Sequence, residues 1–350
     1  MTRYSFLNDY SEGCHPAILE ALVGSNLVQQ SAYGDDQYSI LARKLIGQQL
    51  GKETPPIFFV AGGTLANLII ATTSLRSHEA IIAASSAHIV VHETGAIEAT
   101  GHKIISVPSA DGKLTPADIE TSLAANSHFP HMAKPRLVYI SNATEVGTVY
   151  TKAQLQGLSA VCRANELLLM MDGARLGAAL TAEINDLTLK DIAELTDIFW
   201  IGGTKAGALI GEAIVIPNPQ LALDFAFHIK QRGALLAKGR LLGIQFVELF
   251  SNNLFFDLTR HGNSMAQKLS TAITDCGYGL SAPTESNQIF PILPDTLIDR
   301  LKESYDFYVW GKRDNNHSVI RLVTCWATDE KQVAALIDDI KTRSTQAAIK

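Results

Sequence analysis

Short apolar runs that alternate with helical patterns constrain most strongly how this chain can fold. Segments that indicate short buried strands lie at residues 57–60, 80–84, 103–107, 137–141, 167–171 and 198–201. Stretches with helical spacing of apolar residues lie between them, for example at 116–124 and 151–162. Strands joined through helices run parallel, with helices covering both faces of the sheet. We therefore predict an α/β protein with a mostly parallel sheet.

The pattern changes twice along the chain, which predicts three parts. Residues 1–35 have weak periodicity and are predicted to form an N-terminal arm, and residues 36–250 a large α/β domain. Its last part, 233–250, has the spacing of a long helix. Residues 251–350 combine helical stretches with short strands near 288–293 and 319–323, as in a smaller α+β domain. A chain of 350 residues with 47% hydrophobic content can bury one large core or two unequal ones.

Charge and composition exclude several classes of protein. The net charge is −6 and no Lys/Arg-rich run occurs, which disfavours binding to nucleic acid or to an anionic membrane. No apolar stretch has the length of a membrane span and residues 1–9 lack the apolar core of a signal peptide, so we expect a cytoplasmic protein. No paired spacing that would indicate a disulfide framework or a zinc site occurs among Cys14, Cys162, Cys276 and Cys325.

Lys205 is the first candidate for chemistry. It follows the apolar run 198–201 and lies among small residues, in the sequence Gly202-Gly203-Thr204-Lys205. A lysine at such a strand end can lose part of its hydration, which lowers its pKa and frees the amine to form an imine, as pyridoxal phosphate requires. A Gly-Lys loop is also common as an ordinary solvated loop, so this interpretation depends on partners elsewhere in the chain.

Asp172 is the first such partner. It ends the wholly apolar run 167–171, which places its carboxylate at the carboxyl edge of a parallel sheet. Ligands of open α/β sheets bind at that edge. A carboxylate there can keep a pyridine nitrogen protonated and so make the ring an electron sink. The plain alternative is a helix or turn cap that follows a strand.

A second partner is the turn Ala61-Gly62-Gly63-Thr64, which follows the strand at 57–60. Glycine lets the backbone approach an anion, the first amides of the next helix point at it, and Thr64 adds a hydroxyl donor. The turn lacks the Lys-Ser/Thr ending of a nucleotide P-loop and the three-glycine spacing of a dinucleotide fold. We interpret it as a phosphate cradle, although any tight strand-to-helix turn favours glycine.

Asp172-Gly-Ala-Arg175, followed thirty-three positions later by Thr204-Lys205, resembles the low-specificity threonine aldolases. These belong to the beta-eliminating lyase group of fold-type-I pyridoxal-phosphate enzymes. The likeness extends from Asn8 to the segment 321–324. It implies a pyridoxal-phosphate-dependent transferase fold of the aspartate aminotransferase type, with a large α/β domain and a smaller α+β C-terminal domain. It also implies a homotetramer, a dimer of dimers with shared active sites.

The resemblance assigns roles to several histidines. His88 matches the histidine that stacks on the cofactor ring, where it would also stand close enough to the substrate hydroxyl for base catalysis. The family carries a second active-site histidine before the strand at 137–141, for which His131 and His128 both qualify. His88 or His131 is expected to remove the β-hydroxyl proton of the substrate. His92 lies four residues after His88, a spacing that can bind a metal, but no Glu-x-x-His pattern accompanies the pair and we predict no metal site.

The remaining roles implied by the resemblance concern substrate and phosphate. Arg175 and Arg321 match the arginines that hold the substrate carboxylate, and Asn8 stands where the family usually has a serine that helps them. Tyr33 matches a segment near the cofactor. Lys238 is the basic side chain that would approach the cofactor phosphate of a neighbouring subunit. Ordinary turns, caps and solvated faces would show the same residues.

We therefore expect a carbon–carbon lyase that uses pyridoxal phosphate to cleave β-hydroxy-α-amino acids into glycine and an aldehyde. L-threonine, L-allo-threonine and phenylserine are the candidate substrates. One alternative keeps the cofactor and expels a β-substituent from an amino acid, as a β-eliminating lyase does. An alternative of another class is a catalytically silent binding or assembly subunit. The sequence leaves open the preferred side chain and the threo or erythro preference.

Overall fold

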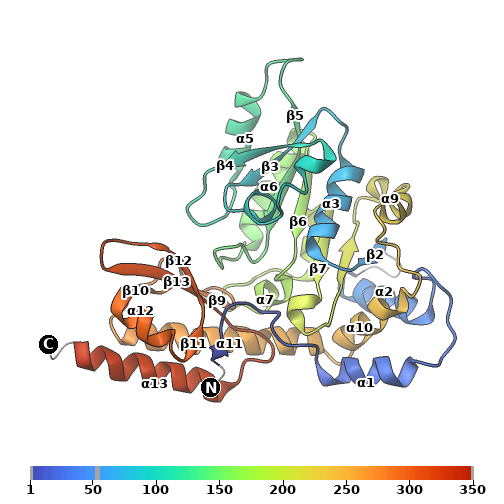
Figure 1. Cartoon of the computed structure of the whole chain (residues 1–350). Helices are drawn as coiled ribbons and strands as arrows, with labels where there is room; N and C mark the ends of the chain where they lie inside the picture. Colours follow the sequence, from blue (N-terminus) through green and yellow to red (C-terminus); the bar gives the residue numbers. More distant parts are fainter. Residues whose placement is uncertain (1–2, 52–55, 348–350) are drawn as a thin grey trace.

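The computed structural model describes residues 3–51 and 56–347. Within them the main sheet has seven strands in the order β2-β8-β7-β6-β5-β3-β4 (Figure 1). Their bounds are β2 (Ile57–Val60), β3 (Glu79–Ala84), β4 (Lys103–Val107), β5 (Lys134–Ser141), β6 (Leu168–Asp172), β7 (Ile198–Gly202) and β8 (Glu212–Val215).

Strand direction confirms the predicted, mostly parallel sheet. β4, β3, β5, β6 and β7 pair in parallel, whereas β8 runs antiparallel to both of its neighbours, β7 and β2. The register pairs Ser141 with Asp172, so β5 and β6 end together at one edge of the sheet. A nine-residue connection, 203–211, joins the antiparallel pair β7 and β8 at the same edge and carries Lys205.

Helices pack on both faces of this sheet because its central strands are apolar on both sides. Leu169 and Met171 of β6 face one hydrophobic cluster, and Leu168 and Met170 face the other, as the alternation of side chains along a strand requires. The helices of this part are α1 (Pro16–Ser25), α2 (Gln37–Gln49), α3 (Gly63–Ser74), α4 (His88–Val91), α5 (Pro116–Ala125), α6 (Lys152–Ala164), α7 (Leu176–Leu180), α8 (Leu189–Leu195), α9 (Phe225–Gln231) and α10 (Arg240–Phe250).

The helix predicted at 233–250 begins later in the structure than the sequence indicated. α10 begins at Arg240, and Gly233 instead ends the preceding helix α9. Gly233 has a φ of +71°, and its amide donates to the Lys230 carbonyl. A glycine in this left-handed conformation is a common way to end a helix. Apolar spacing across the turn resembled a continuous helix.

The last third of the chain forms a smaller part beside the main sheet (Figure 1). It contains α11 (Leu254–Asp275), α12 (Asp295–Leu301), α13 (Glu330–Ala347) and a sheet of β9 (Gln288–Ile289), β10 (Ile292–Pro294), β12 (Tyr308–Lys312) and β13 (His317–Val323). Near the chain start, β1 (Tyr4–Ser5) pairs in parallel with β11 (Tyr305–Asp306), and Phe6 is buried in the core of this part. The boundaries placed after residues 35 and 250 stay predictions.

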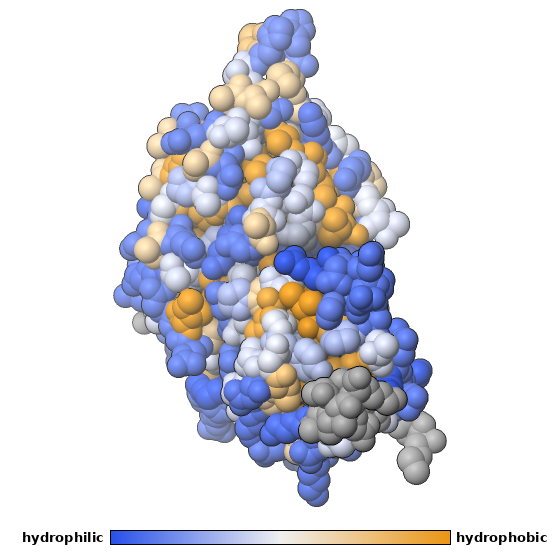
Figure 2. Space-filling view, turned by 90° about the vertical axis from the view of Figure 1, so that its left-hand side faces the viewer, coloured by the Kyte–Doolittle hydropathy of each residue, from blue (hydrophilic) through white to orange (hydrophobic). Residues whose placement is uncertain are grey.

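The surface carries both polar and apolar side chains. On the face shown in Figure 2, hydrophilic residues cover much of the molecule and apolar ones appear in separate patches. Across residues 3–51 and 56–347, none of the helices combines the length and the apolar content that a membrane crossing needs.

Candidate active site

Two adjoining cavities open at the carboxyl edge of the main sheet. The inner cavity, of about 290 Å³, lies over the ends of β5, β6 and β7 and is bordered by Asp172, Gly63 and Thr64. The outer cavity, of about 450 Å³, extends toward β12 and β13 of the smaller part. The residues that border both cavities are Tyr10, His88, Glu145, Arg175 and Lys205.

Lys205 lies in the 3₁₀-helix η2 (Thr204–Ala206), directly after β7. Burial lowers the pKa of its ammonium group, and Arg175 lowers it further, while Asp9, Asp172 and Glu212 oppose the shift without cancelling it. A lysine whose pKa is lowered by burial has more of its amine in the neutral, nucleophilic form. The structure therefore gives this amine the property that the sequence predicted.

A carboxylate on the neighbouring strand β8 fixes the backbone around Lys205. Glu212, the first residue of β8, accepts hydrogen bonds from the Thr204 hydroxyl at 2.9 Å and the Gly203 amide at 3.0 Å. Burial raises the pKa of Glu212 to about 8, although the Thr204 hydroxyl and the charge of Lys205 oppose the shift. The loop that presents the lysine is therefore attached to an adjacent strand.

Asp172 ends β6 and is buried, with three donors around its carboxylate. Oδ2 accepts from the Tyr139 hydroxyl at 2.5 Å and from Asn67 Nδ2 at 3.0 Å, and Oδ1 accepts from the Ala174 amide at 2.9 Å. Burial, followed by the charge of Asp172, raises the pKa of Tyr139 well above its usual value, so the phenol stays a donor. The carboxylate is thus held in one orientation at the floor of the inner cavity.

Asn67 links Asp172 to His88. Its Oδ1 accepts from Trp200 Nε1 at 3.0 Å, and its Nδ2 donates to both Asp172 and Glu93. Glu93 Oε1 lies 2.9 Å from His88 Nδ1. His88 begins the short helix α4, and because Nδ1 is used by Glu93, Nε2 is its remaining ring nitrogen for the cavity. The position of this imidazole is coupled to that of Asp172.

The predicted phosphate cradle lies at the amino end of α3, which has Gly62 as its N-cap. Gly62, Gly63 and Thr64 border the inner cavity together with Thr204. A Cβ atom on Gly63 would lie 2.7 Å from the Trp200 ring, so no larger residue fits there. The first turn of α3 offers free amides, and Thr64 a hydroxyl, to an anion.

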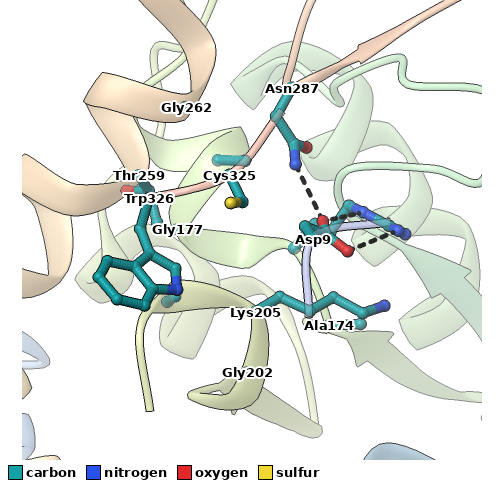
Figure 3. A pocket seen from close by; sticks show the side chains of 13 residues that line it. Asp9, Ala174, Gly177, Gly202, Lys205, Thr259, Gly262, Asn287, Cys325 and Trp326 are labelled. Carbon is teal, nitrogen blue, oxygen red and sulfur yellow. Dashed lines mark hydrogen bonds and ion pairs between the residues drawn. The ribbon is translucent and has the colours of Figure 1, made fainter. Parts of the chain in front are cut away.

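Arg175 forms a buried ion pair that the sequence did not predict. Its Nε and Nη2 donate to the two oxygens of Asp9 at 2.7 and 3.1 Å, and Asn287 donates to the same carboxylate at 2.9 Å. Figure 3 shows Asp9 held in this way beside Lys205. Burial would raise the pKa of Asp9, but Arg175 and Lys205 hold it below its usual value. Arg175 remains at the border of both cavities.

Arg321 reaches the outer cavity from β13. Its guanidinium carbon lies 5.0 Å from the Tyr308 ring centroid and 4.9 Å from that of Trp310, at cation–π distance from both. Nη2 donates to the Leu7 carbonyl at 3.2 Å, whereas the buried Nε has no hydrogen-bond partner among the described residues. The two predicted arginines thus border the same cavity.

His128 and His131, the residues predicted as the second active-site histidine, do not border either cavity of this chain, and their role stays a prediction. His128 and His131 lie on an exposed turn before β5, with their rings 4.9 Å apart. β5 then runs for eight residues, roughly 25 Å, before it reaches Ser141 at the cavity edge. A residue just before one of the parallel strands, such as β5, lies at the amino edge of the sheet, opposite the site.

Three further residues predicted at the site do not border either cavity. Asn8 caps a local turn, because its Oδ1 accepts from the Tyr10 amide at 3.1 Å and the Ser11 hydroxyl at 3.0 Å. Tyr33 and Lys238 are both exposed, and the Tyr33 amide donates to the Ala237 carbonyl beside Lys238. Their predicted contacts with substrate and cofactor stay predictions.

The sequence did not assign roles to several polar residues of the site: Asp9, Asn67, Glu93, Tyr139, Glu145 and Glu212. A usable signal existed for Glu212, which heads the otherwise apolar strand β8. The others depend on contacts between segments far apart in the chain. Across residues 3–51 and 56–347, no group of three or more His, Cys, Asp or Glu residues is arranged to hold a metal ion.

Comparison with known proteins agrees with this geometry. A model of the beta-eliminating lyase family matches residues 6–295. A low-specificity L-threonine aldolase of Pseudomonas sp. is 34% identical over 96% of each chain, and one of Saccharomyces cerevisiae is 28% identical over 86% of this chain and 77% of its own. The solved threonine aldolase of Leishmania major superposes with a TM-score of 0.96 at 49% identity, over 97% of this chain and 99% of its own.

A more distant structure tests the predicted fold. An aspartate aminotransferase mutant of Thermus thermophilus gives a TM-score of 0.71 at 13% identity, over 97% of this chain and 91% of its own. At this identity the likeness shows the fold alone. It confirms the aspartate aminotransferase type that the sequence predicted.

Proposed function

The chain belongs to the beta-eliminating lyase family, and from that premise we propose that it cleaves β-hydroxy-α-amino acids into glycine and an aldehyde with pyridoxal phosphate as its cofactor. L-threonine, L-allo-threonine and phenylserine are its substrates. The observation that carries the proposal is that Lys205 and Asp172 border one cavity of about 290 Å³ together with the amino end of α3. An amine, a carboxylate and an anion cradle are the three groups that this cofactor needs.

The residues of the inner cavity fit pyridoxal phosphate in chemical kind. Lys205 would supply the amine for the cofactor aldehyde, and Asp172, held by Tyr139 and Asn67, would pair with the ring nitrogen. The free amides of the first turn of α3 and the Thr64 hydroxyl would hold the phosphate. The imidazole of His88 would stack on the ring. When bound, the cofactor withdraws the electron pair of the bond that breaks at Cα.

The outer cavity positions the amino acid. Arg175 and Arg321 hold its carboxylate, since planar guanidinium groups suit that anion. Holding the carboxylate at one end and the amine near Lys205 at the other restricts rotation of the substrate, which is a proximity effect on the rate. Cleavage also requires an acceptor for the β-hydroxyl proton. Of the histidines predicted for this role, His88 borders the cavities.

Incubation with L-threonine tests the proposal. We expect a visible absorption band in the purified protein that shifts when glycine or threonine is added, and acetaldehyde and glycine as products. Ammonia and an α-keto acid would show a β-eliminating lyase instead. A colourless protein that releases none of these products would indicate a silent assembly subunit.

We also propose a homotetramer, a dimer of dimers with shared active sites. Large apolar side chains are exposed on and after α1 and on α9, with exposed fractions of 77% for Val23, 92% for Leu27 and 75% for Phe227. Tyr33 and Lys238 lie together outside their own cavities, as side chains that serve a neighbour's phosphate would. Light scattering of the purified protein tests the assembly, with a stable monomer as the contrary result.

We propose a cytoplasmic location. Cys14, Cys162, Cys276 and Cys325 are free thiols, as is usual in a reducing compartment. Fractionation of cells tests this location, and recovery of the protein from an oxidising compartment would contradict it.

A further inference from the structure

Glu145 lies where the inner and outer cavities meet, on the loop between β5 and α6. Among the described residues that border both cavities it is the one carboxylate. One of its oxygens is occupied, since Oε1 accepts from the Ser141 hydroxyl at 2.7 Å and from the His88 amide at 2.9 Å. The backbone amide of Glu145 also interacts with the carboxylate, and no other described residue donates a hydrogen bond to Oε2. The side chain is half-buried, and the cavities lie against it.

The other carboxylates of the site are not available in this way. Asp172 accepts three hydrogen bonds, and Glu212 uses both oxygens to fix the loop around Lys205. Asp9 is paired with Arg175, and the fully buried Glu93 is paired with His88. None of these four borders both cavities. Glu145 is therefore the carboxylate with an oxygen free at the junction.

The surroundings of Glu145 favour proton transfer. Burial raises the pKa of its carboxyl, the Ser141 hydroxyl opposes the shift, and the charge of Asp172 adds to it. A carboxylate with a raised pKa is a stronger base, and a pKa closer to the working pH suits a general base. The other charged or titratable groups at the junction are Arg175, Lys205, His88 and Tyr10.

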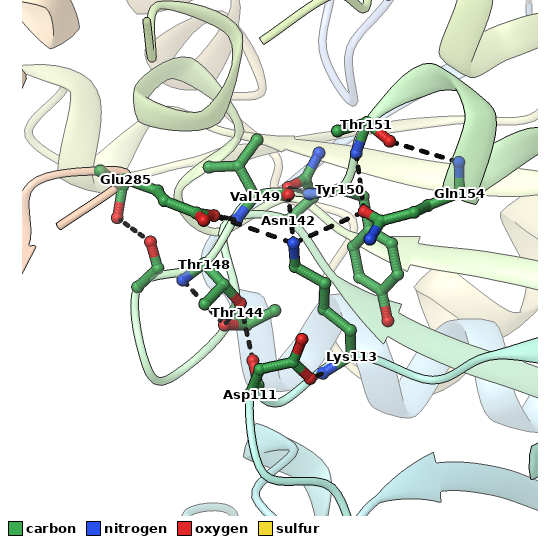
Figure 4. A network of polar contacts seen from close by, with 12 residues as sticks. Asp111, Lys113, Asn142, Thr144, Thr148, Val149, Tyr150, Thr151, Gln154 and Glu285 are labelled. Carbon is green, nitrogen blue, oxygen red and sulfur yellow. Dashed lines mark hydrogen bonds and ion pairs between the residues drawn. The ribbon is translucent and has the colours of Figure 1, made fainter. Parts of the chain in front are cut away.

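The loop that carries Glu145 is held firmly on two sides (Figure 4). The Thr148 hydroxyl donates to the Asp111 carbonyl at 2.7 Å, and Lys113 Nζ donates to the Val149 carbonyl at 2.7 Å. From the smaller part of the molecule, Glu285 Oε2 accepts from the Val149 amide at 2.7 Å. A catalytic group acts best when its support fixes its position before the substrate arrives.

We propose, resting on the proposed aldolase function, that Glu145 accepts the β-hydroxyl proton during cleavage, the role predicted for His88 or His131. The O–H bond breaks and its proton moves to Oε2 of Glu145, while the oxygen electron pair forms the second C–O bond of the aldehyde. The electron pair of the Cα–Cβ bond remains with Cα, which later gains a proton to give glycine. One proton is lost and one gained, so the reaction is balanced.

The variants Glu145→Gln and Glu145→Ala separate this role from a structural one. The glutamine amide oxygen can still accept from the Ser141 hydroxyl and the His88 amide, so E145Q keeps the loop and α4 in place but cannot take a proton. E145A loses both these hydrogen bonds and the proton acceptor. For E145Q we expect kcat for L-threonine to fall by roughly 10²-fold or more, the usual contribution of a general base. Cofactor affinity, measured by absorbance titration, should stay at the wild-type value.

Exchange of the glycine α-proton with deuterated water, followed by NMR, supplies the matched control because it involves no β-hydroxyl. E145Q should exchange this proton near the wild-type rate. A second readout needs neither cofactor nor turnover: the infrared band of a protonated carboxyl in the cofactor-free protein, titrated at acidic pH, should lose one component in E145Q.

Two results would overturn the role of Glu145: wild-type cleavage of threonine by E145Q, or an equal loss of cleavage and of glycine exchange. If E145Q does not fold, the wild type still decides. In the wild type, kcat for threonine must fall at acidic pH as Glu145 becomes protonated, whereas the rate of glycine exchange must not fall with it. Identical pH dependence of the two rates would contradict the role. A wild type that cleaves no β-hydroxy amino acid would instead refute the proposed function itself.

Discussion

The inner and outer cavities are built differently although they share five residues. Around the inner cavity, Asp172 and Asn67 have their polar atoms bound by partners on strands, on α3 and, at Glu93, just after α4. Around the outer cavity, Arg321 Nε has no hydrogen-bond partner in the described part of the chain, and Tyr308 and Trp310 are 46% and 41% exposed. A fixed network suits one cofactor, and a looser aromatic wall suits amino acids with different side chains. We therefore expect substitutions around the inner cavity to lower kcat, and substitutions around the outer cavity mainly to raise KM.

The inner cavity should show the larger effects, beginning with Asp172→Asn. The neutral amide cannot keep the cofactor ring nitrogen protonated, so we expect kcat for threonine to fall by roughly 10²- to 10³-fold. Steady-state kinetics and the absorption spectrum of the bound cofactor measure this loss.

Asp197→Asn is the matched control for Asp172→Asn. Asp197 also accepts hydrogen bonds, from the Leu169 amide and from Asn218, but it lies before β7 at the amino edge of the same sheet. We expect D197N to lower the melting temperature without lowering kcat. Equal losses of kcat in the two variants would remove the distinction between the edges of the sheet.

Substitutions around the outer cavity should mainly weaken substrate binding. Arg321→Lys keeps a positive charge but loses the planar fork, so we expect KM for threonine to rise by roughly 10-fold, with a smaller change in kcat. Cofactor affinity should not change, because Arg321 does not border the inner cavity. A lower cofactor affinity in R321K would show that the two cavities are not independent.

Replacing Glu212, which holds the loop around Lys205, should change how the free energy of unfolding depends on pH. Its pKa of about 8 lies above the value of 4.5 expected when the chain is unfolded. Between these two values the folded state keeps a proton that the unfolded state has released, so the free energy of unfolding falls as the pH rises. In the cofactor-free protein, Glu212→Gln should remove this slope, which for one proton is at most about 1.4 kcal/mol per pH unit.

The exposed Glu330→Gln is the control for Glu212→Gln, and urea unfolding at several pH values is the measurement. Glu330 pairs with Lys268 at the surface, where solvent weakens such contacts. An unchanged slope in E212Q would mean that Glu212 keeps an ordinary pKa in the folded protein.

The smallest effect is expected outside both cavities. His131→Ala should leave kcat and KM for threonine unchanged, since His131 lies on an exposed turn at the opposite edge of the sheet. Steady-state kinetics of H131A against His88→Ala make the comparison. A loss in H131A as large as that in H88A would require a second chain to bring His131 to the site.

Residues at strand ends could be predicted from the sequence, and residues joined across the fold could not. Asp172 and Lys205 follow apolar runs, so a parallel sheet places both at the carboxyl edge. The contacts of Asn67 with Glu93 and Trp200 join segments 26 and 133 positions apart, which no local pattern reports. For His131, the resemblance gave a position in the sequence but did not show on which edge of the sheet that position lies.

Borohydride reduction of the purified protein, followed by peptide mapping, tests the central claim most directly. Reduction should fix the cofactor to one side chain, and the modified peptide should contain Lys205, with no such adduct in Lys205→Ala. An adduct on another lysine, or none in a protein that has bound the cofactor, would contradict the proposal that this amine and the carboxylate of Asp172 hold the cofactor between them.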